Sequence, residues 1–240
     1  MSEVSVPALV GAGIAGYALG SLSPAEAAAR LRGVDLRGSG SGNPGATNAA
    51  RTMGVKVGVL VGAVDVAKGY APVWYFRRYG VGCAEVAGLA AVLGHVTSPL
   101  LKGRGGKGVA TSLGSVLALE PIWAVPVLVG FGATVGATRQ VGIGSVVGSL
   151  TLVPTSIVVW RGRSGVAFAL GMSGLVVYRH RRNLAAFAEQ VRSGRGVRRR
   201  RPPRSSPGWQ GRGGCSRGAR RGWRGPGWRS GAGGPAQILT

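Results

Sequence analysis

The sequence predicts an all-α, polytopic integral membrane protein with about seven transmembrane helices and short Gly-rich loops on the cytoplasmic side. Three observations predict this class. Only 15% of the 240 residues are charged, whereas soluble domains have about 25%. Long apolar runs follow one another over the first three quarters of the chain. Glycine is abundant, with 45 residues, and small residues let helices approach closely in lipid.

The charged residues are distributed unevenly. Residues 1–178 carry 14 Lys and Arg against six acids, and residues 179–240 carry 16 against one. A long apolar segment excludes a disordered polyelectrolyte, and two cysteines are too few for a disulfide scaffold. We therefore expect a membrane-embedded domain over 1–194, followed by a disordered Arg/Gly/Trp-rich tail over 195–240.

The tail has a composition that cannot bury a core. Residues 195–240 contain 12 Arg, 12 Gly and three of the six Trp, without any acid. Such a mixture suits RNA or an anionic lipid surface, and out-of-frame reading of GC-rich coding sequence also produces it. We assign the tail no function and expect no specific nucleic-acid partner.

Seven apolar runs are candidate spans. The first, residues 4–22, has no charge and would be roughly 28 Å long as a helix, enough for the hydrocarbon core. Glu3 before it and further spans after it indicate a retained helix rather than a cleaved signal peptide. The other runs are 55–76, 82–101, 108–119, 121–138, 141–160 and 165–178.

The basic residues between the runs predict the orientation. With the N-terminus outside, the cytoplasmic connections hold nine Lys and Arg and the external ones four, before the tail is counted. We expect a multi-pass protein of the cell membrane with its C-terminus and polar loops in the cytoplasm.

Two apparent nucleotide motifs are rejected. Residues 11–16 spell GxGxxG, but they lie inside an uncharged helical run, whereas a dinucleotide site needs a strand before the glycines. Residues 103–108 approach a P-loop, but Lys107 is followed by Gly instead of Ser or Thr. The first set of glycines is predicted to serve helix packing.

Two Gly-rich loops have the composition of an anion site. The segment 38–51 (GSGSGNPGATNAAR) places hydroxyls and amides among glycines and ends in Arg51, whose guanidinium can hold phosphate oxygens with two hydrogen bonds. The segment 102–108 (KGRGGKG) runs into the N-terminus of an apolar helix, where the dipole favours anions. Flexible basic loops on lipid headgroups are the alternative. Two such loops on one predicted face favour a phosphate pocket.

Further polar residues lie at the last span and within the membrane. In Tyr178–Asn183 (YRHRRN), Arg and Tyr are typical interfacial anchors, whereas His180 and Asn183 share one helix face and can both turn toward the pocket. Asp65 and Lys68, three residues apart at membrane depth, suit a structural ion pair. We expect neither a metal ion nor a cofactor.

Three motifs in this order carry a resemblance to a known family. GSGNPGATNAAR (40–51), GHVTSPLLKGRGGKGVAT (94–111) and YRHRRNL (178–184) closely resemble the bacterial membrane glycerol-3-phosphate acyltransferases that use acyl phosphate. The resemblance covers about residues 4–195. It implies transfer of a fatty acyl group from acyl phosphate to sn-glycerol 3-phosphate, giving 1-acyl-sn-glycerol 3-phosphate (lysophosphatidic acid) and phosphate, the first step of phospholipid biosynthesis. The enzyme that makes the donor in that pathway is the implied functional neighbour.

The resemblance also implies residue roles. Its catalytic positions fall on Ser41, Arg51, Lys107, His180 and Asn183. Its phosphate-binding positions fall on Ser41, Asn43, Thr47, Asn48, Arg51, Gly105, Gly106, Lys107 and Ser145. The chain departs from the family pattern at Ser98, where Pro is usual, at Arg104, where Lys is usual, and at Gly142, where Ser is common.

The donor and one other function class follow from the same residues. Acyltransferases that use thioester donors have a His followed five residues later by an Asp, and the two residues act together as the general base. Neither His95 nor His180 is followed by Asp at this spacing, so an activated donor is expected. A non-enzymatic anion or phosphate transporter with the same basic loops is the alternative. Transporters usually have repeated halves, and no second copy of either loop occurs in the sequence.

Overall fold

The computed structural model describes residues 5–159 and 162–193, all of which fall in one compact unit. Every regular element in this part of the chain is helical. The elements are α1 (Val6–Ser21), α2 (Pro24–Leu31), α3 (Ala46–Met53), α4 (Val55–Phe76), η1 (Arg77–Tyr79), α5 (Val81–Thr97), η2 (Pro99–Leu101), α6 (Val109–Leu119), α7 (Pro121–Thr138), α8 (Val141–Leu150), α9 (Leu152–Val158) and α10 (Gly162–Arg192). The predicted tail over 195–240 lies outside the described residues.

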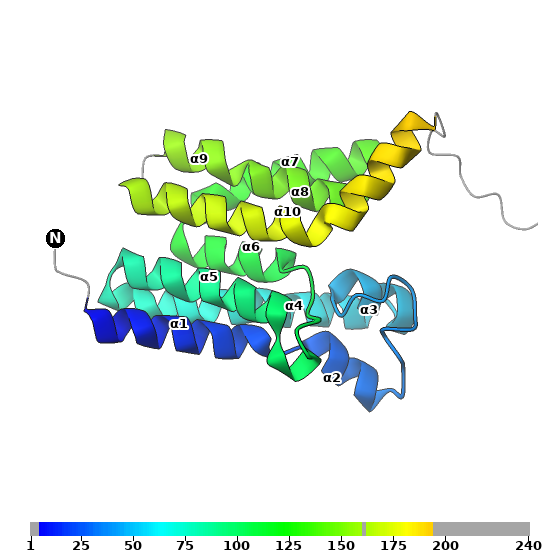
Figure 1. Cartoon of the computed structure of the whole chain (residues 1–240), viewed down its shortest axis with the longest axis horizontal. Helices are drawn as coiled ribbons and strands as arrows, with labels where there is room; N and C mark the ends of the chain where they lie inside the picture. Colours follow the sequence, from blue (N-terminus) through cyan, green and yellow to red (C-terminus); the bar gives the residue numbers. More distant parts are fainter. Residues whose placement is uncertain (1–4, 160–161, 194–240) are drawn as a thin grey trace, which may run out of the picture. The chain divides into compact units, whose positions relative to one another are not determined.

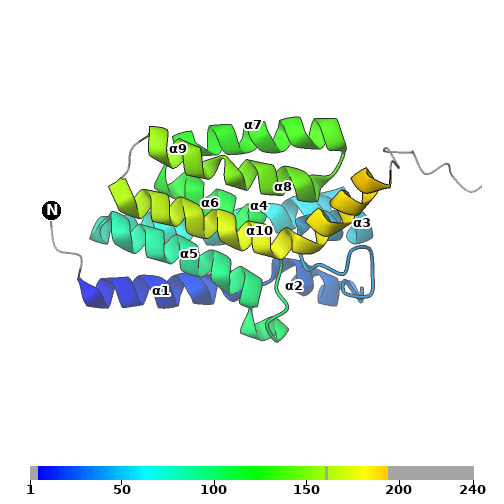
Figure 2. The same ribbon diagram turned by 45° about the horizontal axis from the view of Figure 1, so that its top comes forward.

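The long helices lie side by side, and the short helices α2 and α3 are placed at one end of them (Figure 1). Helix α5 contacts α1, α4, α6 and α10, so it forms the centre of the bundle. On the other side α7 packs on α8, and α8 packs on α10 (Figure 2). This arrangement brings the loops before α3, α6 and α8 to the same end as the last part of α10.

Five segments of the described chain are long and apolar enough to cross a membrane. They are Val6–Leu31, Val55–Tyr79, Val81–Leu101, Pro121–Thr138 and Val141–Val158. The predicted runs 55–76 and 121–138 coincide with α4 and α7. Helix α6 is apolar but has only 11 residues, and α10 is 31 residues long, much longer than the run 165–178. The all-α prediction is confirmed, and the count of seven spans is not established.

The predicted run 141–160 is interrupted. Helix α8 ends at Leu150 and α9 begins at Leu152. Pro154 has no N–H to donate to the carbonyl of Leu150, and its ring crowds that carbonyl. The hydroxyl of Thr151 donates to the Gly148 carbonyl (2.7 Å) and stabilises the break.

The first predicted run, residues 4–22, forms a helix that ends before the polar segment that follows it. Helix α1 stops at Ser21, and α2 starts at Pro24 as a separate helix. The Ser23 side chain accepts a hydrogen bond from the N–H of Glu26 (3.3 Å), which is the usual N-cap arrangement. Helix α2 therefore leaves the axis of α1 because a cap and a proline start a new helix there.

Glycines allow α1 to pack directly on α5. A Cβ atom on Gly16 would overlap the backbone carbonyl of Ala87, and one on Gly20 would overlap that of Ala91. On the partner helix, a Cβ on Gly94 would overlap the carbonyl of Tyr17. Helix α1 runs without interruption through residues 11–16, so the glycines of the apparent dinucleotide motif lie in a helix, as predicted.

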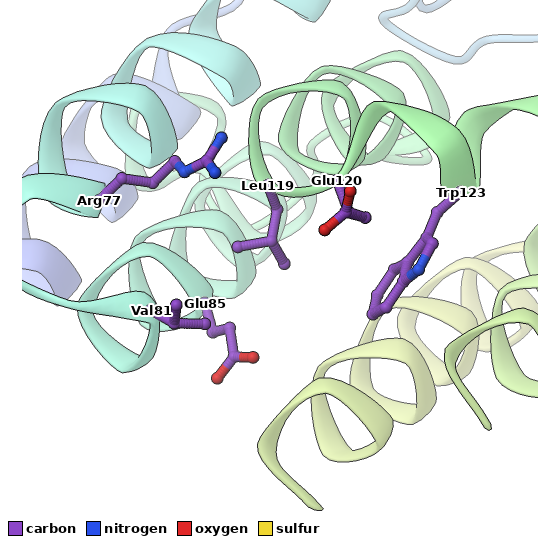
Figure 3. A pocket seen from close by; sticks show the side chains of 6 residues that line it. All are labelled: Arg77, Val81, Glu85, Leu119, Glu120 and Trp123. Atoms are coloured by element: carbon purple, nitrogen blue, oxygen red, sulfur yellow. The ribbon is translucent and has the colours of Figure 1, made fainter. Parts of the chain in front are cut away.

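A small cavity of about 70 Å³ lies at the other end of the bundle, where α4 and α6 end and α5 and α7 begin. Figure 3 shows its lining side chains Arg77, Val81, Glu85, Leu119, Glu120 and Trp123. The guanidinium of Arg77 donates to the carbonyl of Ala118 (2.7 Å) and so satisfies an acceptor in the last turn of α6.

Candidate active site

A cavity of about 570 Å³ lies at the end of the bundle that holds α3. One part of its wall is polar and the other is apolar. The apolar part includes Leu113, Val116, Val127, Leu128, Phe131 and Leu152. Nine of the eleven predicted site residues line the cavity: Ser41, Asn43, Thr47, Asn48, Arg51, Lys107, Ser145, His180 and Asn183. The structure therefore brings together three motifs that are far apart in the sequence.

The first Gly-rich loop is organised around Asn48, which is buried. Its Oδ1 accepts from the N–H of Ser41 (2.8 Å), and its Nδ2 donates to the carbonyls of Leu36 (3.0 Å) and Ser39 (3.1 Å). Both amide hydrogens are thus used inside the loop. Asn48 holds the loop in shape, and its side chain keeps no donor for a phosphate.

The remaining polar groups of this loop face the cavity. Ser41 and Thr47 are exposed residues in its wall, and Asn43 is half-buried. Arg51 lies in the last turn of α3 and is also exposed in the wall. A hydroxyl from the loop and a guanidinium from the helix therefore stand at one opening.

The second Gly-rich loop packs tightly against the end of α5. The N–H of Gly105 donates to the carbonyl of Val96, and that of Gly106 donates to the carbonyl of His95, both at 3.1 Å. A Cβ on either glycine would overlap atoms of His95. Both N–H groups are therefore engaged within the protein in this structure, and the absence of a Cβ lets the turn pack closely on α5.

Helix α10 holds the same turn from the other side. The guanidinium of Arg179 donates to the carbonyls of Gly105 (2.7 Å) and Gly106 (3.1 Å). The sequence indicated only an interfacial anchor for the arginines around His180. The spacing of Arg179 and Asn183 could have indicated this contact, because residues four apart lie on one helix face and Asn183 was predicted to face the pocket.

Lys107 follows this turn and reaches the cavity. Its ammonium donates to Oδ1 of Asn183 at 2.7 Å. Burial lowers the pKa of Lys107, and the positive charge of Arg179 lowers this pKa further. Gly108, in the left-handed conformation (φ 79°), then starts α6, whose first residues also line the cavity. A cation and a helix N-terminus thus act on the same space.

His180 and Ser145 complete the polar wall. The ring of His180 is buried, and its Nδ1 lies 2.8 Å from the carbonyl of Val176. A carbonyl can only accept, so Nδ1 donates to it, and in the neutral ring Nε2 keeps a lone pair. The hydroxyl of Ser145 donates to the carbonyl of Val141 (2.8 Å) and keeps its oxygen lone pairs.

The predicted ion pair within the bundle is present and has a third member. Lys68 Nζ lies 3.0 Å from Oδ1 of Asp65, which confirms the structural pair. His95 Nδ1 lies 3.5 Å from the same oxygen, and both Asp65 and His95 line the cavity. A spacing of five residues between His and Asp in the sequence does not reveal this contact, because Asp65 lies on α4 and His95 on α5. Lys68 also donates to the carbonyl of Leu22 and so ties α4 to the end of α1.

The departures from the family pattern have local explanations. The hydroxyl of Ser98 is buried and donates to the carbonyl of Ser21 (2.6 Å). A Cβ on Gly142 would lie 2.7 Å from Nδ2 of Asn183, so glycine leaves room for that amide. Arg104 is exposed and outside the cavity wall, and its carbonyl accepts from Arg37 (3.1 Å).

Comparisons with known proteins agree with these motifs and this fold. A family model described as glycerol-3-phosphate acyltransferase matches residues 10–190. The chain is 39% identical over 170 residues to glycerol-3-phosphate acyltransferase 1 of Deinococcus radiodurans, covering 70% of this chain and 86% of the relative. It is 38% identical over 175 residues to the glycerol-3-phosphate acyltransferase of Geobacter sulfurreducens, covering 72% and 90%.

A solved structure has the same fold. The crystal structure of PlsY, an integral membrane glycerol 3-phosphate acyltransferase, matches with a TM-score of 0.73 and 35% identity, covering 79% of this chain and 94% of that one. The family match, the identities and the shared helical fold leave one assignment. The chain belongs to the glycerol-3-phosphate acyltransferase family and is a membrane acyltransferase of phospholipid synthesis.

Proposed function

We propose that the chain transfers a fatty acyl group from acyl phosphate to sn-glycerol 3-phosphate, giving lysophosphatidic acid and inorganic phosphate. The observation that carries this proposal is the cavity, whose polar end holds Arg51 and Lys107 and whose wall continues into apolar side chains. Such a wall suits molecules that join a phosphate to an acyl chain. Two solved relatives support it, because they are described as the glycerol 3-phosphate form and the lysophosphatidic acid form of PlsY.

The polar groups divide between two phosphates. The guanidinium of Arg51, with the hydroxyls of Ser41 and Thr47 beside it, offers two parallel donors to the phosphate of glycerol 3-phosphate. Lys107 and the N-terminus of α6 offer a point charge and backbone N–H groups to the phosphate of the donor. Asn43 and Ser145, which also line the cavity, provide further neutral polar groups.

The chemistry needs mainly positioning and charge stabilisation. Acyl phosphate is a mixed anhydride with a good leaving group. The acceptor hydroxyl oxygen forms a bond to the acyl carbonyl carbon, the bond from that carbon to the phosphate oxygen breaks, and the hydroxyl proton goes to the leaving phosphate. Asn183 and His180 orient the reacting groups, since Asn183 holds Lys107 and His180 keeps an acceptor nitrogen.

The Asp65–His95 contact does not replace the activated donor in this scheme. Asp65 Oδ1 lies closer to the Lys68 ammonium (3.0 Å) than to His95 Nδ1 (3.5 Å), so the main ionic partner of the carboxylate is Lys68. The three residues form a buried ionic cluster. The two cationic positions in the cavity, Arg51 and Lys107, support acyl phosphate as the donor.

The distribution of basic residues supports one orientation of the chain in the membrane. The cavity end of the bundle carries five exposed basic residues: Arg30 on α2, Arg32 and Arg37 in the segment after it, Lys56 in the first turn of α4, and Lys102 in the second Gly-rich loop. By the excess of Lys and Arg in cytoplasmic connections, the cavity opens to the cytoplasm and the N-terminus lies outside the cell membrane. The enzyme that makes acyl phosphate is then its neighbour in the pathway.

One assay tests the reaction. Purified protein receives radiolabelled glycerol 3-phosphate with either palmitoyl phosphate or palmitoyl-CoA, and labelled lysophosphatidic acid is counted. We expect product with palmitoyl phosphate alone. Product with the thioester alone would overturn the donor, and no product with either would overturn the proposed reaction.

A further inference from the structure

The loop that carries Lys107 has all its central backbone groups engaged by two helices. The N–H groups of Gly105 and Gly106 donate to α5, and their carbonyls accept from Arg179 of α10. A four-group arrangement of this kind leaves the turn little freedom, since each buried polar group would lose its partner if the turn moved.

The same face of α10 holds both the turn and the lysine. Arg179 contacts the turn, and Asn183, one helical turn later, accepts from the ammonium of Lys107 at 2.7 Å. Helix α10 also packs against α5, which holds the other side of the loop (Figure 1). The backbone of residues 105–106 is therefore clamped between two helices that already contact each other.

We infer that Arg179 is a positioning residue, which fixes the Gly105–Gly106 turn and thereby places the Lys107 ammonium in the cavity. The inference deepens the proposed function and rests on it for the role of Lys107. Arg179 itself does not line the cavity, so it acts through the turn and through its charge. Arginine suits this task because its planar fork donates to two acceptors at once, which a lysine ammonium does with less definite geometry.

Arg179→Gln is the main variant, and Arg179→Lys is the conservative one. Arg182→Gln is the matched control, because Arg182 is an exposed arginine on the same helix. With glycerol 3-phosphate and palmitoyl phosphate, we expect kcat/KM to fall about 10- to 100-fold in Arg179→Gln, from the loss of charge-assisted hydrogen bonds. Arg179→Lys should recover part of this loss, and Arg182→Gln should behave as the wild type.

The pH profile separates positioning from a general loss of structure. Arg179 lowers the pKa of Lys107 by its charge, so Arg179→Gln should move the alkaline limb of kcat/KM to higher pH, whereas Arg179→Lys should leave it in place. The charged and titratable groups around Lys107 remain the same in all variants: His180 on α10, Asp65 on α4, His95 on α5, Arg51 on α3 and Arg139 after α7. A lower melting temperature with an unmoved limb would overturn the inference.

Hydrogen exchange tests the clamp without any substrate. Peptides covering residues 103–108 should exchange roughly 10- to 100-fold faster in Arg179→Gln than in the wild type or Arg182→Gln. Equal exchange and equal kcat/KM in the two Gln variants would overturn the inference. A wild-type protein that is inactive with palmitoyl phosphate would instead contradict the proposed function, and the exchange result would still decide the clamp.

Discussion

The ammonium of Lys107 donates to Oδ1 of Asn183 over 2.7 Å, and this bond joins two residues that are 76 positions apart. It links the Gly-rich turn before α6 to the last part of α10. Because Asn183 accepts only one of the three ammonium hydrogens, the other two remain for a substrate phosphate. The neutral partner holds the lysine in place without cancelling its charge.

Lys107 and Arg104 should differ sharply on substitution. Lys107→Ala removes a charge in the cavity wall, and we expect transfer to be abolished. Arg104→Ala should be milder, because the Arg104 side chain is exposed and lies outside the wall. The measurement is the initial rate with glycerol 3-phosphate and palmitoyl phosphate. Equal losses in the two variants would show that the phosphate position is elsewhere.

Arg51 should affect one substrate and spare the other. Arg51→Lys keeps the charge and loses the bidentate fork, and charge-assisted hydrogen bonds contribute about 1.5–3 kcal/mol. We expect the KM for glycerol 3-phosphate to rise roughly 10- to 150-fold, while the KM for acyl phosphate moves little. Steady-state kinetics with each substrate varied in turn checks this. A defect confined to acyl phosphate would reverse the assignment of the two phosphates.

The activity should depend on the protonation of Lys107 at alkaline pH. Burial and Arg179 lower the pKa of Lys107, and only the protonated form is a cation for phosphate. As pH rises through this lowered pKa the charge is lost, so kcat/KM should start to fall at lower pH than an ordinary lysine, with a pKa of about 10.4, would cause. In Lys107→Arg any remaining activity should lack this limb. A limb that persists in that variant belongs to another group.

The buried ionic cluster should contribute to stability. Lys68→Met leaves the Asp65 carboxylate without its nearest cation, and breaking such a pair costs about 3–5 kcal/mol. We expect a clear fall in the melting temperature in detergent, with partial recovery when Asp65→Asn is added. Lys56→Met is the control, since Lys56 is an exposed lysine on the same helix. Similar melting of the two Met variants would contradict a stabilising role.

The contact of α1 with α5 should not tolerate a methyl group. In Gly16→Ala the new Cβ would overlap the carbonyl of Ala87, and overpacking of this kind costs about 1–3 kcal/mol. Gly132→Ala is the matched control on α7, because a Cβ there meets no atom within 4 Å. Thermal unfolding in detergent should separate the two variants, and equal midpoints would show that the helices can move apart without cost.

Local patterns in the sequence predicted the all-α class, several helices and most of the polar residues that line the cavity. Hydropathy over about 20 residues predicted α4 and α7 at their observed bounds. The chain also pairs polar loops with apolar runs, so residues such as Ser41, Arg51 and Lys107 were predicted to face one pocket, and all three line the cavity. The sequence did not predict the break at Thr151. A single proline hardly changes the hydropathy of an apolar run, but it removes a backbone hydrogen bond of the helix.

The sequence by itself determined the class of protein, the family and most of the polar residues of the cavity wall, because composition, run length and motif order are properties of neighbouring residues. Only the tertiary structure decided how backbone groups are used. Asn48 uses its amide hydrogens inside its own loop, Gly105 and Gly106 donate to α5, Arg179 of α10 donates to the turn before α6, and His95 of α5 contacts Asp65 of α4. The contacts of Gly105, Gly106, Arg179 and His95 depend on how α4, α5 and α10 pack, and no local pattern encodes the distance between segments that are dozens of residues apart.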